Sequence, residues 1–302
     1  PTVAYLYART VRCKNCRATV PLLKTRWLCK KDRKRVLLRM EPNKERSGVV
    51  FGIESNVPVQ GGNSAQRREN DKRIGAGTMS RSGARCPCCG TIMTMEDIRL
   101  EGKAGRLDAI STAVVVDGQK GKEYRLPNPH ELKMAEETND SLESLFAQIP
   151  FGVPEEKIIE DAKRNTWCVQ YGVDSFKKLF TSRQLLAIGM FVKWTREISK
   201  EMALKRYSQD LIEAVLCYLA LQNDKVADYN SMVCVWHLSR ELIGHTFTRF
   251  SLPISWDYAE LAVINEVGGS YAAQLDWVAR FIEHALSACA KSPHPRFCLL
   301  YT

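Results

Sequence analysis

Two pairs of cysteines have the residue type and the spacing from which metal chemistry can be expected. The pairs are Cys13 with Cys16 and Cys86 with Cys89, each with two residues between its members. Such a gap lets a tight turn direct two thiolates at one ion, and four sulfurs about 2.3 Å from the ion form a structural zinc site. In the second pair, Pro87 presets the turn and Gly90 closes it without a side-chain clash. The sequence therefore predicts a zinc site with the ligands Cys13, Cys16, Cys86 and Cys89.

The spacing between the two pairs is wide. Cys16 and Cys86 are 70 positions apart, whereas compact zinc ribbons place about 15 to 20 residues between their pairs. The intervening segment must leave the metal, fold and return. Two other interpretations stay open: unrelated turns, or a redox motif. The redox interpretation is weaker, because it needs a preceding strand and a following helix, and neither flank has that pattern.

Charge divides the chain into two unequal parts. Residues 1–126 hold 26 Lys and Arg against 12 Asp and Glu, a net charge of +14, and residues 127–302 have a net charge of −4. The excess positive charge thus lies with the cysteine pairs. Such asymmetry indicates contact with nucleic acid or with a membrane surface, and a phosphate backbone attracts a basic surface whatever its sequence. A solvated surface is the alternative for any single run of charge.

Cysteine usage and hydropathy indicate the compartment. Besides the pairs, Cys168, Cys217, Cys234 and Cys289 occur singly in apolar surroundings, which fits a reducing cytoplasm better than a disulfide scaffold. Cys29 and Cys88 are further thiols close to the predicted ligands. No apolar run approaches 18 residues, and the first residues lack the layout of a signal peptide. The chain does not begin with methionine, so we expect it to be a piece of a longer protein.

The fold class predicted from periodicity is α+β, with a β-rich zinc-ribbon lobe followed by a mainly helical domain. Strands are expected at 18–28, 35–40, 48–53, 109–117 and 122–126, with a basic hairpin tip at 30–35 and a strand or short helix at 91–98. Pro127-Asn128-Pro129 predicts the domain boundary, which gives domains of 1–126 and 127–302. Helices are expected at 130–138, 141–148, from a capping box at Thr181 and Gln184 onward, after Ser208, and at 275–286.

Residues 60–85 are rich in Gly, Ser and Arg and nearly free of large apolar side chains. This composition predicts a long mobile loop that becomes ordered on binding. A basic loop of this kind can settle onto phosphates, and the alternative is a surface excursion of low entropic cost. The predicted nucleic-acid-binding residues are Arg67, Arg68, Lys72, Arg73, Arg81 and Arg85.

Motifs for a self-contained active site are missing from the sequence. It has neither a dinucleotide fingerprint, nor a phosphate loop, nor a nucleophile elbow, nor a His-Glu-x-x-His zinc motif. Its five histidines lack the spacing of a zincin site, and the apolar stripes of the predicted helices are ordinary core surfaces. The sequence therefore predicts no catalytic residue.

Several longer motifs resemble the central part of adenine-specific DNA methylases that contain a zinc ribbon. The motifs are residues 2–16, Pro21-Leu22, Trp27-Leu28, Cys86-Pro87-x-Cys89-Gly90, Leu179-Phe180-Thr181-x-Arg183-Gln184-Leu185-Leu186-Ala187, Phe191-Val192-Lys193-Trp194-Thr195-Arg196 and Leu252-Pro253-x-x-Trp256-Asp257-Tyr258-Ala259-Glu260. The resemblance runs from the first residue to about His284. It implies transfer of a methyl group from S-adenosylmethionine to the amine of adenine in DNA, in bacterial modification or phage defence.

The family's Gly-rich cofactor turn and its Pro-Pro-Tyr/Phe motif, which grips the flipped base, are both missing from this sequence. In the family they precede and follow the stretch that this chain resembles, and residues 288–298 leave the family pattern. The resemblance therefore implies a central module, with S-adenosylmethionine bound only in a complete parent enzyme and the remaining domains supplied in cis or in trans. Only the four cysteines are carried over as site residues.

Three hypotheses follow from the sequence. The first is a zinc-binding, DNA-contacting module of the methyltransferase that is not catalytic by itself. The second is a stand-alone zinc-ribbon adaptor that binds protein or RNA. The third is an active methylase that binds its cofactor without the usual turn.

Overall fold

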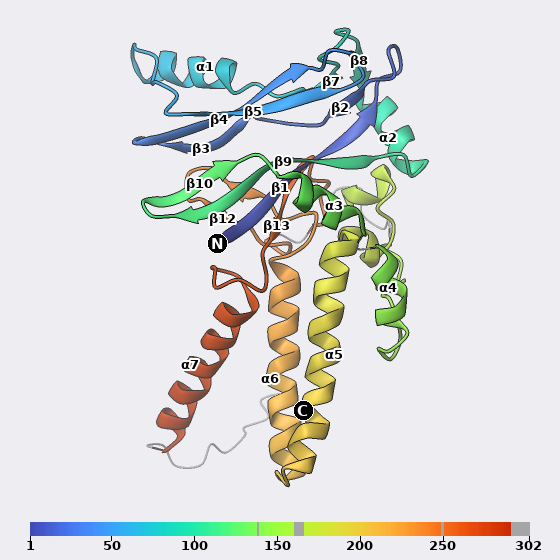
Figure 1. Cartoon of the computed structure of the whole chain (residues 1–302), viewed down its shortest axis with the longest axis vertical. Helices are drawn as coiled ribbons and strands as arrows, with labels where there is room; N and C mark the ends of the chain where they lie inside the picture. Colours follow the sequence, from blue (N-terminus) through green and yellow to red (C-terminus); the bar gives the residue numbers. More distant parts are fainter. Residues whose placement is uncertain (138, 160–165, 249–250, 291–302) are drawn as a thin grey trace, which may run out of the picture.

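The computed structural model of the protein describes residues 1–137, 139–159, 166–248 and 251–290. Strands prevail in the N-terminal part and helices in the C-terminal part, so the predicted α+β class is confirmed (Figure 1). Of the tail at 288–298 singled out from the sequence, residues 288–290 belong to the last helix and the rest lie outside the described ranges, as does the final residue of the helix expected at 130–138.

A central antiparallel sheet holds the molecule together. Its strands are β1 (Thr2–Arg12), β2 (Thr19–Pro21), β9 (Asp108–Gly118), β10 (Gly121–Arg125) and β13 (Asp257–Leu261). Their order is β10-β9-β1-β13, and β2 pairs with the end of β1. The hairpin of β9 and β10 confirms the strands expected at 109–117 and 122–126.

The strand β1, which with β9 is one of the two longest of the sheet, was missed by the sequence analysis. Ten of its eleven residues are buried or half-buried, because β9 and β13 flank it and other layers cover both of its faces. A strand covered on both faces loses the polar-apolar alternation by which strands are recognised. Its partner β13 comes from the far end of the chain, so the sheet crosses the predicted boundary at 127.

Three smaller sheets make up the rest of the β structure in the described residues. The first is β3 (Trp27–Lys31), β4 (Lys34–Pro42) and β5 (Val49–Ser55), the second is β6 (Met79–Ser80), β7 (Gly83–Arg85) and β8 (Ile92–Thr94), and the third is β11 (Trp236–His237) and β12 (Leu242–Ile243). Figure 1 shows β3–β5 as a layer above the central sheet. The main core lies between these layers, where Leu28, Val36 and Leu38 share one apolar cluster with Leu6 and Val115.

The helices are α1 (Ser64–Ile74), α2 (Met95–Lys103), α3 (Pro129–Glu137), α4 (Asn139–Phe146), α5 (Ser182–Leu204), α6 (Gln209–Asp228) and α7 (Tyr271–Ala290), with short 3₁₀ turns η1 (Trp167–Tyr171) and η2 (Phe176–Leu179). The Thr181–Gln184 capping box begins α5 and Ser208 caps α6, as predicted. The long helices α5 and α6 pack together and extend away from the sheets, and α7 contacts α6 (Figure 1).

The prediction of a loop over residues 60–85 is wrong for much of that segment, because α1, β6 and β7 occupy it. Asn63 caps α1 by accepting hydrogen bonds from the amides of Ala65 and Gln66, and the Gln66 side chain accepts one from the amide of Asn63. At the other end, Arg26 Nη2 donates to the carbonyl of Ile74 at 2.6 Å. Hydrogen bonds, and ion pairs from Asp71 to Arg35 and Lys30, therefore hold this helix in place. The pattern of apolar residues along the sequence does not predict such polar contacts.

Candidate metal centre

Two similar turns bring the four predicted cysteines together. The first follows β1, and the second connects β7 to β8. In each turn an amide four residues on donates to the carbonyl of the leading cysteine: Arg17 to Cys13 at 3.0 Å, and Gly90 to Cys86 at 2.9 Å. Both donor residues have a left-handed backbone conformation, with φ of +61° at Arg17 and +78° at Gly90. Glycine meets this requirement at the lower conformational cost, and Arg17 meets it with a side chain present.

The sulfur atoms of the four cysteines all lie within 4.8 Å of one another. Cys13 Sγ is 3.7 Å from Cys89 Sγ, and Cys16 Sγ is 3.6 Å from Cys86 Sγ. Thiolates about 2.3 Å from a shared tetrahedral ion would be about 3.8 Å apart. The cluster could therefore hold a metal ion, and the interpretation as two unrelated turns is wrong.

The surroundings of the cluster are part apolar and part polar. Cys13 and Cys86 are buried beside Val11, Ala84 and Met93, whereas Cys16 and Cys89 are exposed. Burial raises the pKa of the Cys86 thiol. The cluster thus has a buried side, where a bare thiolate is costly, and an open side towards solvent.

Thr91, which the sequence analysis missed, lies beside the exposed edge of the cluster. Its hydroxyl oxygen is 3.3 Å from Cys89 Sγ. Hydrogen bonding by Thr91 lowers the pKa of Cys89 to about 5. A thiol with this pKa is ionised at neutral pH, which is the form that binds metal. A hydroxyl two residues after the last cysteine was the available signal.

Neighbouring elements hold both turns in place. Lys14 Nζ forms an ion pair with Asp97 at 2.7 Å. This ion pair connects the cysteine turn of residues 13–16 to the N-terminal end of α2. This ion pair lowers the pKa of Asp97. Behind the cluster, the rings of Tyr171 and Trp256 meet edge to face at 4.9 Å within the same apolar cluster. Residues after position 127 thus pack against the part of the chain that holds the four cysteines.

The two further thiols are not part of the cluster. Cys88, between two ligands, is buried with its sulfur 3.3 Å from the carbonyl of Gly48. Cys29 belongs to the main core between the sheets. Each side chain therefore packs as a small buried apolar group.

The six predicted nucleic-acid-binding residues are all exposed, but they fall into two groups. Arg67, Arg68, Lys72 and Arg73 belong to α1. Arg81 and Arg85 belong to the β6–β7 hairpin. In Figure 1, α1 is at one end of the upper layer and β7 and β8 are at the other. The structure therefore offers two basic sites, separated along one layer, in place of one continuous loop.

The basic residues of α1 are weakly paired. Lys72 Nζ is 3.9 Å from Glu69, with the two side chains 81% and 74% exposed. Arg67 donates to the carbonyl of Gly62 and Arg73 to the side chain of Asn70. An exposed ion pair of this length contributes little to stability, so these charges are available to a partner.

Comparison with protein families, with characterised proteins and with solved structures finds no match to this chain. Among the described residues, no helix is both long enough and apolar enough to cross a bilayer.

Proposed function

We propose that this chain is the central zinc-binding, DNA-contacting module of a bacterial S-adenosylmethionine-dependent adenine-specific DNA methyltransferase, and that it is not catalytic by itself. The observation that carries the proposal is the meeting of Cys13 and Cys16 with Cys86 and Cys89 at one point. Four cysteines form a closed structural site, for which zinc is the preferred ion. The sequence resemblance supplies the link to methyl transfer.

A metal at this site would clamp the ends of the basic segment. Residues 17–85 leave the first turn and return at the second, and within them lies α1. An ordered helix loses less conformational entropy on binding than a loop, because it is already fixed before contact. Zinc therefore serves to position the basic side chains on a rigid lobe, where they contact phosphates and leave base specificity to other parts.

DNA binding tests this proposal directly. Fluorescence anisotropy with duplexes of unrelated sequence, between 50 and 300 mM salt, should show affinity that falls steeply with salt. Replacing Arg67, Arg68, Lys72 and Arg73 with Gln should reduce the slope of log K against log salt by about 3 to 4, since each phosphate contact contributes about 0.9.

A matched control is available on the helical hairpin, the pair of long helices α5 and α6. Replacing Lys193, Arg196, Lys200 and Lys205 with Gln removes the same charge from α5 and its end, and we expect the slope to stay within 1 of the original. Equal losses for both variants would show only a general charge effect. Binding that is absent, or insensitive to salt, would contradict the proposal.

The chain alone should not bind the methyl donor. S-adenosylmethionine belongs to a complete parent enzyme, in which the remaining methylase domains act in cis or in trans. Calorimetric titration of the isolated chain with S-adenosylmethionine should release no binding heat. A measurable dissociation constant would favour the hypothesis of an active methylase instead. We expect the protein to act in the reducing cytoplasm, where thiolates stay available to metal.

One observation favours the second hypothesis, a zinc-ribbon adaptor. An apolar groove of about 460 Å³ separates α6 from α7, and Trp277, Phe281 and Leu221 line it with 70%, 59% and 62% of their surfaces exposed. Exposed aromatic patches of this kind are typical of protein contacts. The RNA-binding form of this hypothesis is tested by competition. RNA that displaces bound duplex DNA at a lower concentration than unlabelled duplex DNA does would favour the adaptor.

A further inference from the structure

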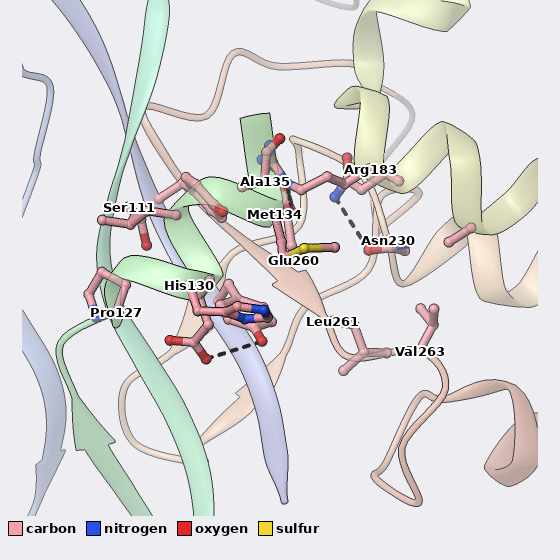
Figure 2. A pocket seen from close by; sticks show the side chains of 16 residues that line it. Ser111, Pro127, His130, Met134, Ala135, Arg183, Asn230, Glu260, Leu261 and Val263 are labelled. Carbon is pink, nitrogen blue, oxygen red and sulfur yellow. Dashed lines mark hydrogen bonds and ion pairs between the residues drawn. The ribbon is translucent and has the colours of Figure 1, made fainter. Parts of the chain in front are cut away.

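A cavity separate from the cysteine cluster lies between the central sheet, α3 and the start of α5 (Figure 2). Its volume is about 410 Å³, within the range of about 300 to 1,000 Å³ that small-molecule sites occupy. The polar and aromatic side chains that line it include Tyr5, Ser111, His130, Arg183, Asn230 and Glu260.

Strand register explains why the sheet residues meet on one face. Tyr5 lies opposite Glu260 on β13, and Tyr7 lies opposite Ser111 on β9. Tyr5 and Tyr7 are two apart on β1, so their side chains point the same way, and directly opposed residues share a face. Ser111 reaches this face, although Ala113 lies in the core, because the register of β1 and β9 shifts between Leu6 and Tyr7. The other face of β1 carries Ala4, Leu6 and Ala8 into the main core. This sheet is therefore apolar on its core face and polar-aromatic on its cavity face.

The charges that line the cavity cancel in pairs. Arg183 binds Glu260 through two hydrogen bonds, of 2.6 and 2.9 Å. Glu131, the other lining carboxylate, is bound in the same manner at 2.6 and 2.8 Å by Arg125, which lies outside the lining. A charged ligand would find no free counter-charge in either pair and would lose its hydration. The lining therefore favours a ligand without net charge.

Ser111 supplies the independent sign of a ligand. Its side chain lines the cavity, the residue is only 8% exposed, and its hydroxyl has no hydrogen-bond partner among the described residues. A buried hydroxyl without a partner costs about 1 to 3 kcal/mol. Asn230, buried to 2% exposure, adds an amide whose oxygen accepts from Gln184 at 3.4 Å. The hydroxyl oxygen has almost no accessible surface, so a ligand that shifts a neighbouring side chain and hydrogen-bonds to Ser111 would remove this cost.

We propose that this cavity binds a neutral, flat heteroaromatic ring that carries hydrogen-bonding groups on its edge and has the size of a nucleobase. Tyr5 and His130 offer aromatic contact, Leu261 and Val263 offer apolar contact, and Ser111 reads the edge of the ring. Two sources supply this chemistry: a free nucleoside, or an unpaired base of a DNA strand. The second source rests on the proposed function, and the first does not.

Ligand-detected NMR on the full chain tests the proposal with two sets of probes. The first set is the four deoxynucleosides at millimolar concentration, and the second is single strands of eight nucleotides. Ala135 on α3 lines the cavity, and Ala135→Trp should fill it and abolish binding. Lys133→Trp, on the same helix but outside the lining, should leave affinity within about twofold, so it controls for the added indole ring.

The hydroxyl is tested by a second matched pair. Ser111→Ala should weaken binding about 2- to 10-fold, which corresponds to one hydrogen bond, without lowering the unfolding temperature. Thr112→Val removes the neighbouring buried hydroxyl, which donates to the carbonyl of Leu6 at 3.0 Å. This variant should lose stability and keep its affinity for the ring. The comparison of Ser111→Ala with Thr112→Val tests whether the ring binds at this cavity even if Ala135→Trp fails to fold.

Nucleoside binding that Ala135→Trp abolishes supports a free ring as the ligand. Binding of strands alone, abolished by the same change, supports an unpaired base. Absence of binding by both sets, or binding that Ala135→Trp and Ser111→Ala leave unchanged, overturns the proposal. Duplex affinity of the α1 variant is measured separately, so failure of the proposed function is distinguishable from failure of this site.

Discussion

Arg183, in the first turn of α5, and Glu260, on β13, form a two-bond ion pair that fastens the helical hairpin to the central sheet. Glu260 is only 5% exposed, and the Arg183 guanidinium also lies 4.8 Å from the centre of the Tyr7 ring. Tyr7 in turn stacks on Tyr258 at 5.5 Å. The ion pair thus joins parts of the chain that are 77 residues apart in sequence.

Replacing Glu260 with Gln should lower the free energy of unfolding by about 3 kcal/mol, because it leaves a largely buried guanidinium without its counter-charge. Urea unfolding measures this loss. Glu101→Gln is the control, since Glu101 forms a two-bond pair with Arg106 whose side chain is 59% exposed. The control should lose less than about 1 kcal/mol. Equal losses in the two variants would show that burial does not decide the strength of these pairs.

Cys86→Ser should remove the metal and destabilise the lobe around it. We expect the purified protein to hold about one zinc ion per chain and the variant to hold almost none. The free energy of unfolding should fall by at least about 3 kcal/mol, because metal binding contributes to folding. Elemental analysis and urea unfolding measure the two effects.

The control for the metal prediction is Cys88→Ser, which changes a thiol in the same turn but outside the cluster. It should keep the full metal content. Loss of metal in this variant as well would mean that the turn, and not the four thiolates, decides binding.

Gly90→Ala should destabilise the protein by about 1 kcal/mol, because alanine is strained in a left-handed conformation. The φ angle of Gly90 is +78°, and a Cβ placed there would meet no atom within 4 Å, so strain alone is tested. Gly90→Asn should cost less, since asparagine tolerates this region. Gly61→Ala, at a position without positive φ and with equally open space, should cost nothing measurable in thermal unfolding.

Asp71→Asn should change how stability depends on pH. A hydrogen bond from Arg35, and a further one from Lys30, lower the pKa of Asp71 below its ordinary value of 3.8. A carboxyl with a depressed pKa stabilises the fold at pH above its ordinary value, and this contribution is lost as pH falls through the folded pKa. Stability of the native sequence should therefore fall more steeply below about pH 4 than that of the variant.

At pH 7 the same variant should be less stable by about 3 kcal/mol, since Arg35 is left buried without its partner. Urea unfolding at pH 7, 5, 4 and 3 checks both statements. Glu69→Gln, on the same helix but in a loose exposed pair, should follow the native curve. Parallel pH curves for Asp71→Asn and the native protein would contradict the pKa argument.

Local chemistry explains which elements were predictable. The capping box at Thr181 and Gln184 begins α5, and Ser208 caps α6, because a side chain that satisfies free amides acts within one turn. The helix α1 was missed although Asn63 and Gln66 form a box of the same type. Its other contacts come from Arg26, which precedes β3, and from Trp27 and Arg35 on β3 and β4, 36 to 48 residues before their partners. No local pattern announces contacts of that range.

The four cysteines, the uneven charge and the helical periodicity can be recognised along the chain, because each depends on neighbouring residues and on composition. Folding in three dimensions is needed for the two cysteine turns to share one point, for β13 to join the sheet of β1, and for Ser111, Arg183 and Glu260 to line one cavity. These relationships connect residues 70 or more positions apart. They arise when strands pair and helices dock, and those events depend on the whole chain.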